Sequence, residues 1–302
     1  MLPWLHLARV SNLPTVWTNV TAAWLLAGGV LTDPRLLWLI LAGSLLYTGG
    51  MILNDAADVK FDREHRKERP IPSGQISVKA AWGVGIVMLL SGAWVALAKG
   101  WAHPLFIAGL VICILFYDFY HKPWAGSVIV MGACRTMLIC MAGSARLVDL
   151  AFEETNWLIC PSFRLGLESL NYLPRLVVIH AIAVGVYTVA LSMAARSGGK
   201  STLRFLLWMP LMTLLSGTVA NMTLDSARPL SLLVVLAAFA LLVISAQVRL
   251  RAGKIDAAVG LLLAGFVIAD ALAICTTSPV LALAFVAAAP LLRFWQRWVA
   301  AT

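Results

Sequence analysis

The sequence predicts an all-α protein, a polytopic transmembrane helical bundle of about nine or ten membrane-spanning helices around a central cavity. The first reason is composition: of 302 residues, 61% are hydrophobic and 12% are charged, whereas a soluble domain is about half apolar and about a quarter charged. The second is that apolar runs of roughly 20 residues, long enough to cross a bilayer core of about 30 Å, recur along the chain. We expect residues 1–302 to form a single integral-membrane domain.

The apolar runs give the order of the helices. The opening segment, MLPWLHLARV, lacks the pattern of a cleaved signal peptide, so we expect it to be retained. The stretches 54–77 and 144–173 are long, and the other gaps are too short for a separate domain. The predicted spans are 13–31, 35–53, 78–98, 103–120, 124–143, 174–194, 204–222, 229–250, 256–275 and 279–298.

Lys and Arg gather on one side of a ten-span arrangement. The formal net charge is +9, and basic residues that flank spans set orientation and meet anionic head groups. No nucleic-acid-binding motif accompanies them, so we expect contact with membrane lipid and no nucleic-acid partner. The positive-inside bias predicts that residues 54–77, 121–123 and 195–203 face the cytoplasm from a bacterial-type plasma membrane, with 144–173 on the opposite side.

An acidic stripe follows the second span, in NDAADVKFDREHRKERPIPSG (residues 54–74). Asn54, Asp58 and Asp62 recur every four residues, so on a helix they share one face. Carboxylate and amide oxygens at a helix end suit Mg²⁺, which usually takes one or two carboxylates together with phosphate oxygens of a substrate. The pattern therefore predicts a Mg²⁺ site with these three residues as ligands.

Basic residues follow this stripe directly. Arg66, Lys67 and Arg69 stand where they could bind a diphosphate, the arginines through their planar forks. The alternative interpretation is a solvated, salt-bridged loop that only fixes topology. The four-residue register and the asparagine favour the binding site over that alternative.

The motif NDxxDxxxD followed by RPIPSG resembles the signature of the UbiA superfamily of intramembrane prenyltransferases. The resemblance implies that Asn54, Asp58 and Asp62 bind Mg²⁺ and a prenyl diphosphate, with the two aspartates serving catalysis. Asp55 and Arg69 match the same motif, and we expect both to bind substrate.

Further segments fit the same family. ARVSNLP, residues 8–14, matches its opening helix. Tyr117 and Lys122, in YDFYHK, resemble its Tyr-and-Lys element with one extra residue between them, which implies that Lys122 contacts the diphosphate; the alternative is a lysine that reaches the membrane interface. Arg135, in MGACR, is costly in hydrocarbon, so we expect it to face a cavity and bind substrate, or else to bridge helices.

The sequence departs from the family after the sixth span, where a second acidic motif, DxxxD, normally holds a second Mg²⁺. Residues 169–224 contain no Asp or Glu. In one register Arg196 and Lys200 occupy the positions of the two aspartates of DxxxD. Their positive charges could then stabilise the diphosphate in place of a metal ion. In the other register Ala190 and Ala194 replace the acids, and the site is weakened.

His180 in the sixth span and Asp270 in the ninth are polar groups at membrane depth. Ionisable groups in such positions are candidates for function by default. A hydrogen bond between helices is the more ordinary role, and we expect it for both.

Three functions compete. Mg²⁺-dependent transfer of a prenyl group from a prenyl diphosphate to an aromatic or hydroxyl-bearing small-molecule acceptor fits the stripe and its basic flank best. A transporter predicts internal repeats or paired broken helices, and the two halves of this chain do not match. A catalytically degenerate relative that binds a lipid or a protein partner is the third, and the missing second acidic motif is its main support.

The predicted orientation can be tested with single cysteines in a cysteine-free background. Lys67→Cys is expected to resist an impermeant maleimide added to intact cells and to react after permeabilisation, because residues 54–77 are predicted to be cytoplasmic. A single cysteine within 144–173 is the matched control and should react from outside. Labelling of position 67 in intact cells would contradict the orientation.

Overall fold

The computed structural model describes residues 2–120, 124, 126–147, 173–196, 202–214 and 228–295. Every regular element within these ranges is a helix, which confirms the all-helical fold class. The helices are α1 (Leu2–Leu7), η1 (Val10–Asn12), α2 (Leu13–Leu26), α3 (Pro34–Ala57), α4 (Val59–His65), α5 (Val78–Ala98), α6 (Pro104–Tyr120), α7 (Ser127–Ser144), α10 (Arg175–Arg196), η4 (Thr202–Trp208), α12 (Arg228–Arg251), α13 (Ile255–Ile274) and α14 (Pro279–Trp295).

Six of the described helices are long and apolar enough to cross a membrane by length and composition. These are α3, α5, α7, α10, α12 and α13. Shorter helices stand in the remaining predicted spans: α2 has 14 residues, and α6, α14 and the segment 204–214 are also short and apolar. The predicted transmembrane helical bundle is therefore confirmed, with six full-length spans and several shorter apolar helices among the described residues.

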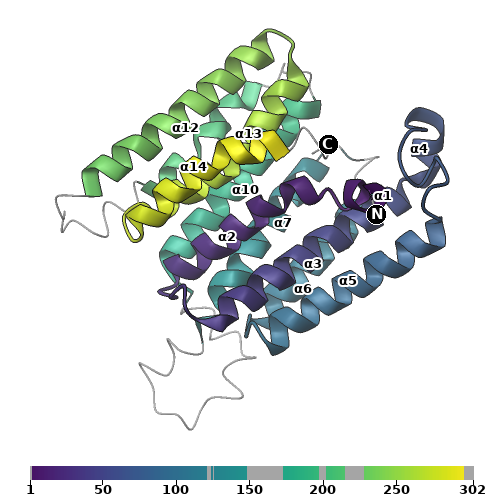
Figure 1. Ribbon diagram of the computed structural model, residues 1–302, viewed down its shortest axis with the longest axis horizontal. Coiled ribbons are helices and arrows are strands. Elements are labelled where there is room, and N and C mark those ends of the chain that lie inside the picture. The colour runs from purple at the N-terminus through teal and green to yellow at the C-terminus, as the bar shows by residue number, and fades with distance from the viewer. Residues whose placement is uncertain are drawn as a thin grey trace.

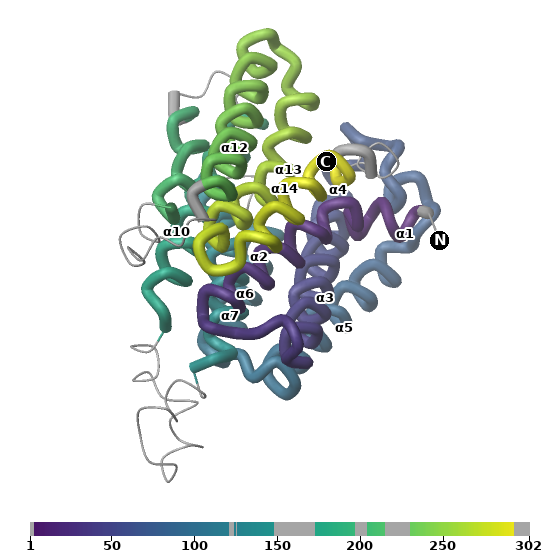
Figure 2. Tube along the Cα trace, turned by 60° about the vertical axis from the view of Figure 1, so that its left-hand side comes forward, coloured from purple at the N-terminus to yellow at the C-terminus, as the bar shows by residue number. Residues whose placement is uncertain are grey.

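The long helices run roughly side by side in a bundle (Figure 1). In both ribbon and tube views α3 and α5 lie on one side and α12 on the other, with α2 and α7 between them (Figure 2). Helix α2 packs against α3, α7 and α13, and so joins the two sides. Helix α13 is largely enclosed by its neighbours, because 83% of its span is buried. Helices α5 and α12 lie at the outside of the bundle, with only 33% of their spans buried.

Two predicted spans differ from the structure. The first was expected to run to residue 31, but α2 ends at Leu26 because Gly28 adopts a φ of +79°, a conformation that favours glycine. The Trp24 indole N–H then donates to the carbonyl of Val30 at 2.9 Å and folds the chain back. The span predicted at 204–222 begins inside the 3-10 helix η4, and its residues 215–222 lie outside the described ranges.

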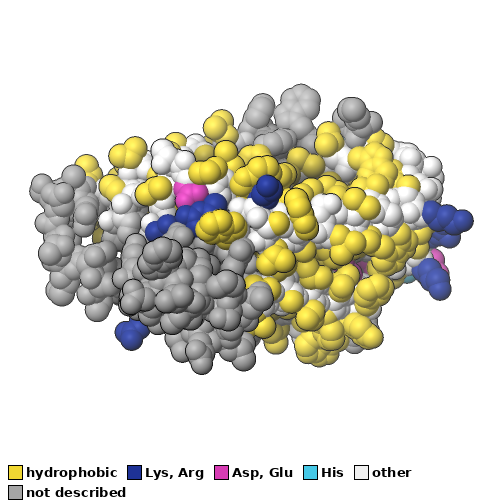
Figure 3. All heavy atoms as spheres, turned by 90° about the horizontal axis from the view of Figure 1, so that it is seen from below, with side chains coloured by type: hydrophobic (Ala, Val, Ile, Leu, Met, Phe, Trp, Pro, Cys, Tyr) yellow, Lys and Arg dark blue, Asp and Glu magenta, His cyan; other side chains and the backbone are white. Residues whose placement is uncertain are grey.

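The outer surface is largely apolar (Figure 3). Large side chains that point outward include Leu37, Leu90, Ile112 and Leu241, each more than 60% exposed. Lys and Arg side chains appear at the end of the molecule where α4 lies and at a few other places on the face drawn in Figure 3. An apolar girdle with a basic end is the surface expected of a protein that sits in a bilayer and meets anionic head groups.

Glycines bring α7 and α10 into close contact. A Cβ added to Gly132 would lie 2.7 Å from both the Gly185 carbonyl oxygen and Val189 Cγ2. Small residues at helix crossings let the backbones approach, which is how helices associate when lipid offers no hydrophobic driving force. The α7–α10 contact therefore depends on the absence of a side chain at Gly132.

We expect Gly132→Ala to lower the free energy of unfolding by about 1–3 kcal/mol, the usual effect of overpacking a tight contact. Gly83→Ala is the control, because a Cβ at that position on α5 meets no atom within 4 Å. It should be neutral or stabilising by up to about 1 kcal/mol. Thermal unfolding of both purified variants in one detergent measures the difference, and equal melting temperatures would contradict the prediction.

Candidate functional site

The acidic stripe lies where α3 passes into α4. The N–H of Asp58 donates to the carbonyl of Asn54, and that of Asp62 to the carbonyl of Asp58, each at 2.9 Å. The helical register therefore continues across the boundary, and the three side chains share one face, as their spacing predicts. All three are buried, with exposed fractions of 7%, 9% and 1% for Asn54, Asp58 and Asp62.

Two arginines hold the acidic groups in place. Arg69 Nη1 lies 3.2 Å from Asp55 Oδ1 and 2.8 Å from Asp62 Oδ2. Arg9, which comes from the segment before η1, lies 3.3 Å from the same Asp55 oxygen. The turn that follows Arg69 is anchored by the buried Ile71, so the basic residue of RPIPSG folds back onto the stripe. Sequence analysis placed Arg69 at this site but assigned no partner to Arg9.

A charged cavity of about 770 Å³ opens beside this cluster. Its lining includes Arg9, Asp55, Arg66 and Arg69. Arg66 caps the end of α4. Of the three basic residues predicted to bind a diphosphate, Arg66 and Arg69 line this cavity and Lys67 does not. The arrangement can hold an anion through charge-assisted hydrogen bonds from arginine.

A second cavity, of about 290 Å³, lies inside the bundle and is mostly apolar. Helices α3, α6, α7, α10 and α13 form its walls. It shares Arg9, Ala195 and Val259 with the charged cavity. The central cavity expected from the sequence is therefore present, and it adjoins the charged one.

Polar residues stand at the mouth of the apolar cavity. Tyr117 and Arg196 both line it, the Tyr117 hydroxyl lies against the Arg196 guanidinium, and Arg196 Nη1 donates to Ser127 Oγ at 3.0 Å. Ala190 and Ala194, the alternative positions for the lost acids, are buried and line neither cavity. Lys122 and Lys200 lie outside the described residues.

Asp118, next to Tyr117 on α6, lies at the same mouth and was missed by sequence analysis. It is 5% exposed, lines the apolar cavity and adjoins Asn54. The side-chain amide of Asn54 and the carboxyl of Asp118 face each other as hydrogen-bond donor and acceptor. An ionisable residue within an apolar helix is a candidate for function, so the sequence could have identified Asp118. The analysis of YDFYHK considered only Tyr117 and Lys122.

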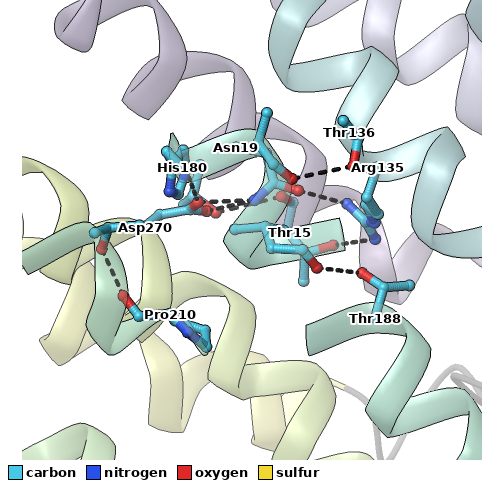
Figure 4. A network of polar contacts seen from close by, with 12 residues as sticks. Thr15, Asn19, Arg135, Thr136, His180, Thr188, Pro210 and Asp270 are labelled. Carbon is cyan, nitrogen blue, oxygen red and sulfur yellow. Dashed lines mark hydrogen bonds and ion pairs between the residues drawn. The ribbon is translucent and has the colours of Figure 1, made fainter. Parts of the chain in front are cut away.

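Arg135 lines the apolar cavity, as expected, and it also bridges helices. Its Nη1 donates to Asn19 Oδ1 at 2.8 Å and its Nη2 to Thr15 Oγ1 at 3.0 Å. Asn19 Nδ2 in turn donates to both Asp270 oxygens at 2.8 Å, and His180 Nε2 lies 3.0 Å from Asp270 Oδ1. Figure 4 shows Asn19 between the arginine and the aspartate. The expected interhelical bonds of His180 and Asp270 are confirmed.

Comparison with known proteins decides the family. The sequence model of the UbiA prenyltransferase family matches residues 14–259. The chain belongs to the UbiA prenyltransferase family. The match contains the acidic stripe, the Tyr117 region and Arg135, so the resemblance read from the motifs is confirmed.

Several UbiA-family relatives are similar over part of their length. A digeranylgeranylglyceryl phosphate synthase of Methanoculleus marisnigri is 32% identical over 111 residues, 37% of this chain and 33% of that protein. One of Sulfurisphaera tokodaii is 28% identical over 158 residues, 51% and 54%. A 4-hydroxybenzoate octaprenyltransferase of Acidovorax ebreus is 31% identical over 150 residues, 49% and 51%. The chain thus spans about half or less of the length of these relatives.

Solved structures of the UbiA family share the fold. The apo structure of a UbiA homolog from Aeropyrum pernix K1 has a TM-score of 0.63 and 19% identity, covering 87% of this chain and 96% of that one. A structure described for the biosynthesis of digeranylgeranylglyceryl phosphate synthase in membranes has a TM-score of 0.55 and 15% identity, covering 95% and 97%. At these identities the likeness establishes the helical architecture.

The residues of this UbiA-family chain fit a magnesium ion that the substrate helps to bind. No group of three His, Cys, Asp or Glu side chains converges on one point within the described ranges. Mg²⁺ needs no such cage, because it usually keeps several waters and takes one or two carboxylates plus phosphate oxygens. Asp62 is already paired with Arg69, and the carboxylates of Asp58 and Asp62 together with the side-chain oxygen of Asn54 are the oxygen donors that the stripe offers to such an ion.

We expect Asp270→Ala to destabilise the protein by about 3–5 kcal/mol, because it would leave the buried Arg135 charge uncompensated. Asp256→Ala is the matched control on α13, since Asp256 is exposed in the first turn and should cost less than about 1 kcal/mol. Denaturant titration in detergent measures both. Equal effects of the two substitutions would show that the buried network contributes no stability.

Proposed function

We propose that this UbiA-family protein transfers a prenyl group from a prenyl diphosphate to an aromatic or hydroxyl-bearing small-molecule acceptor, with Mg²⁺ as cofactor. The observation that carries the proposal is the pair of adjoining cavities, one charged and one apolar, that share Arg9. A prenyl diphosphate has the same two-part character, a dense anion joined to a hydrocarbon chain. The names of the relatives, a digeranylgeranylglyceryl phosphate synthase and a 4-hydroxybenzoate octaprenyltransferase, support the same class of reaction.

The diphosphate is proposed to lie in the charged cavity. Arg9, Arg66 and Arg69 line that space, and arginine forks suit phosphate oxygens. Arg196, at the shared mouth, would contact the diphosphate from α10, in the region where other family members carry their second acidic motif. Its place on the cavity wall supports the register that puts a cation there. We propose that Lys122 and Lys200 also contact the diphosphate.

Asn54, Asp58 and Asp62 would hold Mg²⁺. When bound, the ion supplies positive charge that stabilises the departing diphosphate. Arg69 keeps Asp55 and Asp62 oriented through contacts of 3.2 and 2.8 Å. These fixed donors need no reorganisation as charge develops on the leaving oxygen, which is how preorganised sites lower a barrier.

The allylic carbon is proposed to react at the apolar end. Its bond to the diphosphate oxygen breaks, the electron pair stays on that oxygen, and the acceptor forms the new bond and releases a proton. The apolar wall excludes water, which would otherwise capture the carbon. The Arg135 guanidinium lies over the Phe266 ring, 4.7 Å from its centroid. Asn19 links it to the Asp270 carboxylate, which offsets its charge. These contacts fix the position of Arg135 in the cavity wall.

The proposed setting is a bacterial-type plasma membrane with the active-site loops on the cytoplasmic side. The apolar girdle and the basic end at α4 support an integral position (Figure 3). The isoprenoid tail would reach the apolar cavity from lipid, while the diphosphate approaches from the aqueous side. The two ends of one amphiphilic substrate would then each lie in the cavity that suits them.

The metal requirement tests this function. We expect turnover of a radiolabelled prenyl diphosphate in proteoliposomes to need Mg²⁺ or Mn²⁺ and to stop in excess EDTA. Asp58→Ala should lower kcat/KM at least about 100-fold, because a metal contributes several kcal/mol and each 1.4 kcal/mol is a factor of ten. Glu64→Ala is the matched control, since Glu64 is exposed on α4.

Full activity in EDTA or in the Asp58→Ala variant would contradict the metal site. Binding of a prenyl diphosphate without turnover, tested with 4-hydroxybenzoate and with a glycerol phosphate lipid as acceptors, would instead support a degenerate member that only binds lipid.

A further inference from the structure

Two polar side chains of the apolar cavity hold no substrate in the mechanism above. Tyr47 on α3 and Arg135 on α7 both line this cavity, and the Arg135 guanidinium carbon lies 5.8 Å from the centre of the Tyr47 ring. The Phe266 ring of α13 lies on the same guanidinium, 4.7 Å from its carbon. We call the part of the cavity beside these three side chains the inner subsite.

The inner subsite lies deeper in the bundle than the acidic stripe. Tyr47 precedes Asn54 by seven residues on α3, and residues seven apart share one face of a helix. At a rise of 1.5 Å per residue they are about 10 Å apart along the axis. A molecule with one end at the inner subsite therefore has its other end near the position proposed for the departing diphosphate.

Hydrogen-bonding capacity is left over at this subsite. A guanidinium carries five N–H donors, and within the described residues those of Arg135 make two hydrogen bonds, to Asn19 Oδ1 and Thr15 Oγ1. The Tyr47 hydroxyl, within the same part of the chain, makes none. An isoprenoid chain packed against these donors would leave them without an acceptor, which is costly away from water. The inner subsite therefore suits an oxygen atom of the second substrate, the acceptor.

The charge of Arg135 is already balanced. Asn19 joins its guanidinium to the Asp270 carboxylate through bonds of 2.8 Å on both sides (Figure 4). His180 contributes no positive charge to this set, because its Nδ1 is buried without a partner in the described ranges and a proton there would find no acceptor. An anionic group bound at the inner subsite would add a second negative charge close to Asp270, at a high desolvation cost. An uncharged oxygen accepts the same hydrogen bonds without that cost.

We propose that the inner subsite binds the acceptor through an uncharged oxygen, a carbonyl or a hydroxyl, that accepts hydrogen bonds from Arg135 and Tyr47. The reacting atom of the acceptor then points towards the mouth of the cavity, where Tyr117 lies. This inference rests on the proposed function and narrows its acceptor to molecules whose inner end carries no charge.

Binding of two matched phenols tests the assignment without turnover. 4-Hydroxybenzamide and 4-hydroxybenzoate have nearly the same shape, but only the second carries a negative charge at neutral pH. The full chain in detergent, with Mg²⁺ and inorganic pyrophosphate present, is titrated with each phenol and followed by saturation-transfer NMR. We expect 4-hydroxybenzamide to bind at least about 10-fold more tightly, because the carboxylate would be buried without its own cation. Equal or tighter binding of 4-hydroxybenzoate, or no saturable binding of either phenol, would overturn the proposal.

Tyr47→Phe separates binding from folding, whereas replacement of Arg135 would also break the buried network. The substitution removes one hydroxyl that bonds to no described residue, so the melting temperature without ligand should equal that of the parent. The affinity for 4-hydroxybenzamide should fall about 3- to 10-fold, the effect of one neutral hydrogen bond. Tyr120→Phe is the matched control, because Tyr120 is exposed on α6 and lines neither cavity. Parental affinity in Tyr47→Phe would contradict the inner subsite.

The outcomes distinguish this inference from the proposed function. Mg²⁺-dependent turnover of a prenyl diphosphate, together with equal binding of the two phenols, would uphold the function and overturn the inner subsite. Selective binding of 4-hydroxybenzamide that depends on Tyr47, without turnover of any acceptor, would support the subsite and contradict prenyl transfer.

Discussion

The buried contact between Asn19 and Asp270 is the interaction on which the bundle most depends. Asn19 joins the Asp270 carboxylate to Arg135 through bonds of 2.8 Å, and His180 completes the set. These residues come from α2, α13, α7 and α10, so one polar chain ties four helices together. Lipid cannot satisfy such groups, and any separation of the helices would expose a charge to hydrocarbon. The network therefore fixes the walls of the apolar cavity.

A second set of charges orders the other end of the site. Arg9 and Arg69 reach Asp55 from opposite ends of the N-terminal region, one before α2 and the other beyond α4. The ion pair of Arg69 secures the segment between α4 and α5 against the end of α3, and that of Arg9 secures the segment before η1. The charged cavity thus lies where α3 leaves the apolar part of the bundle, and the change from apolar to charged surroundings takes place within a few residues of Asn54.

Features set by local rules were predictable from the sequence. Apolar run length gave α3, α5, α10 and α13 within a few residues, and the four-residue register placed Asn54, Asp58 and Asp62 on one face before any contact was known. The end of α2 at Leu26 was missed because the glycine after it was read as part of a span.

Features that depend on distant partners were not predictable. Asn19 and Asp270 are 251 positions apart in the chain, and no periodicity connects them. Asp118 was missed, since only the packing of α6 beside α3 reveals that it adjoins Asn54. Sequence motifs identified which residue types serve the chemistry, and tertiary packing decided which of them meet.

The wall shared by the two cavities has a consequence for which molecules the protein accepts. Besides Arg9 it contains only Ala195 and Val259, both compact side chains. The junction between the charged and the apolar cavity therefore brings one guanidinium together with two small aliphatic side chains. A change of one or two methyl groups at position 195 or 259 would alter the width of this junction without removing an ion pair. The thickness of a hydrocarbon chain that fits there is thus set by different side chains from those that pair with charge.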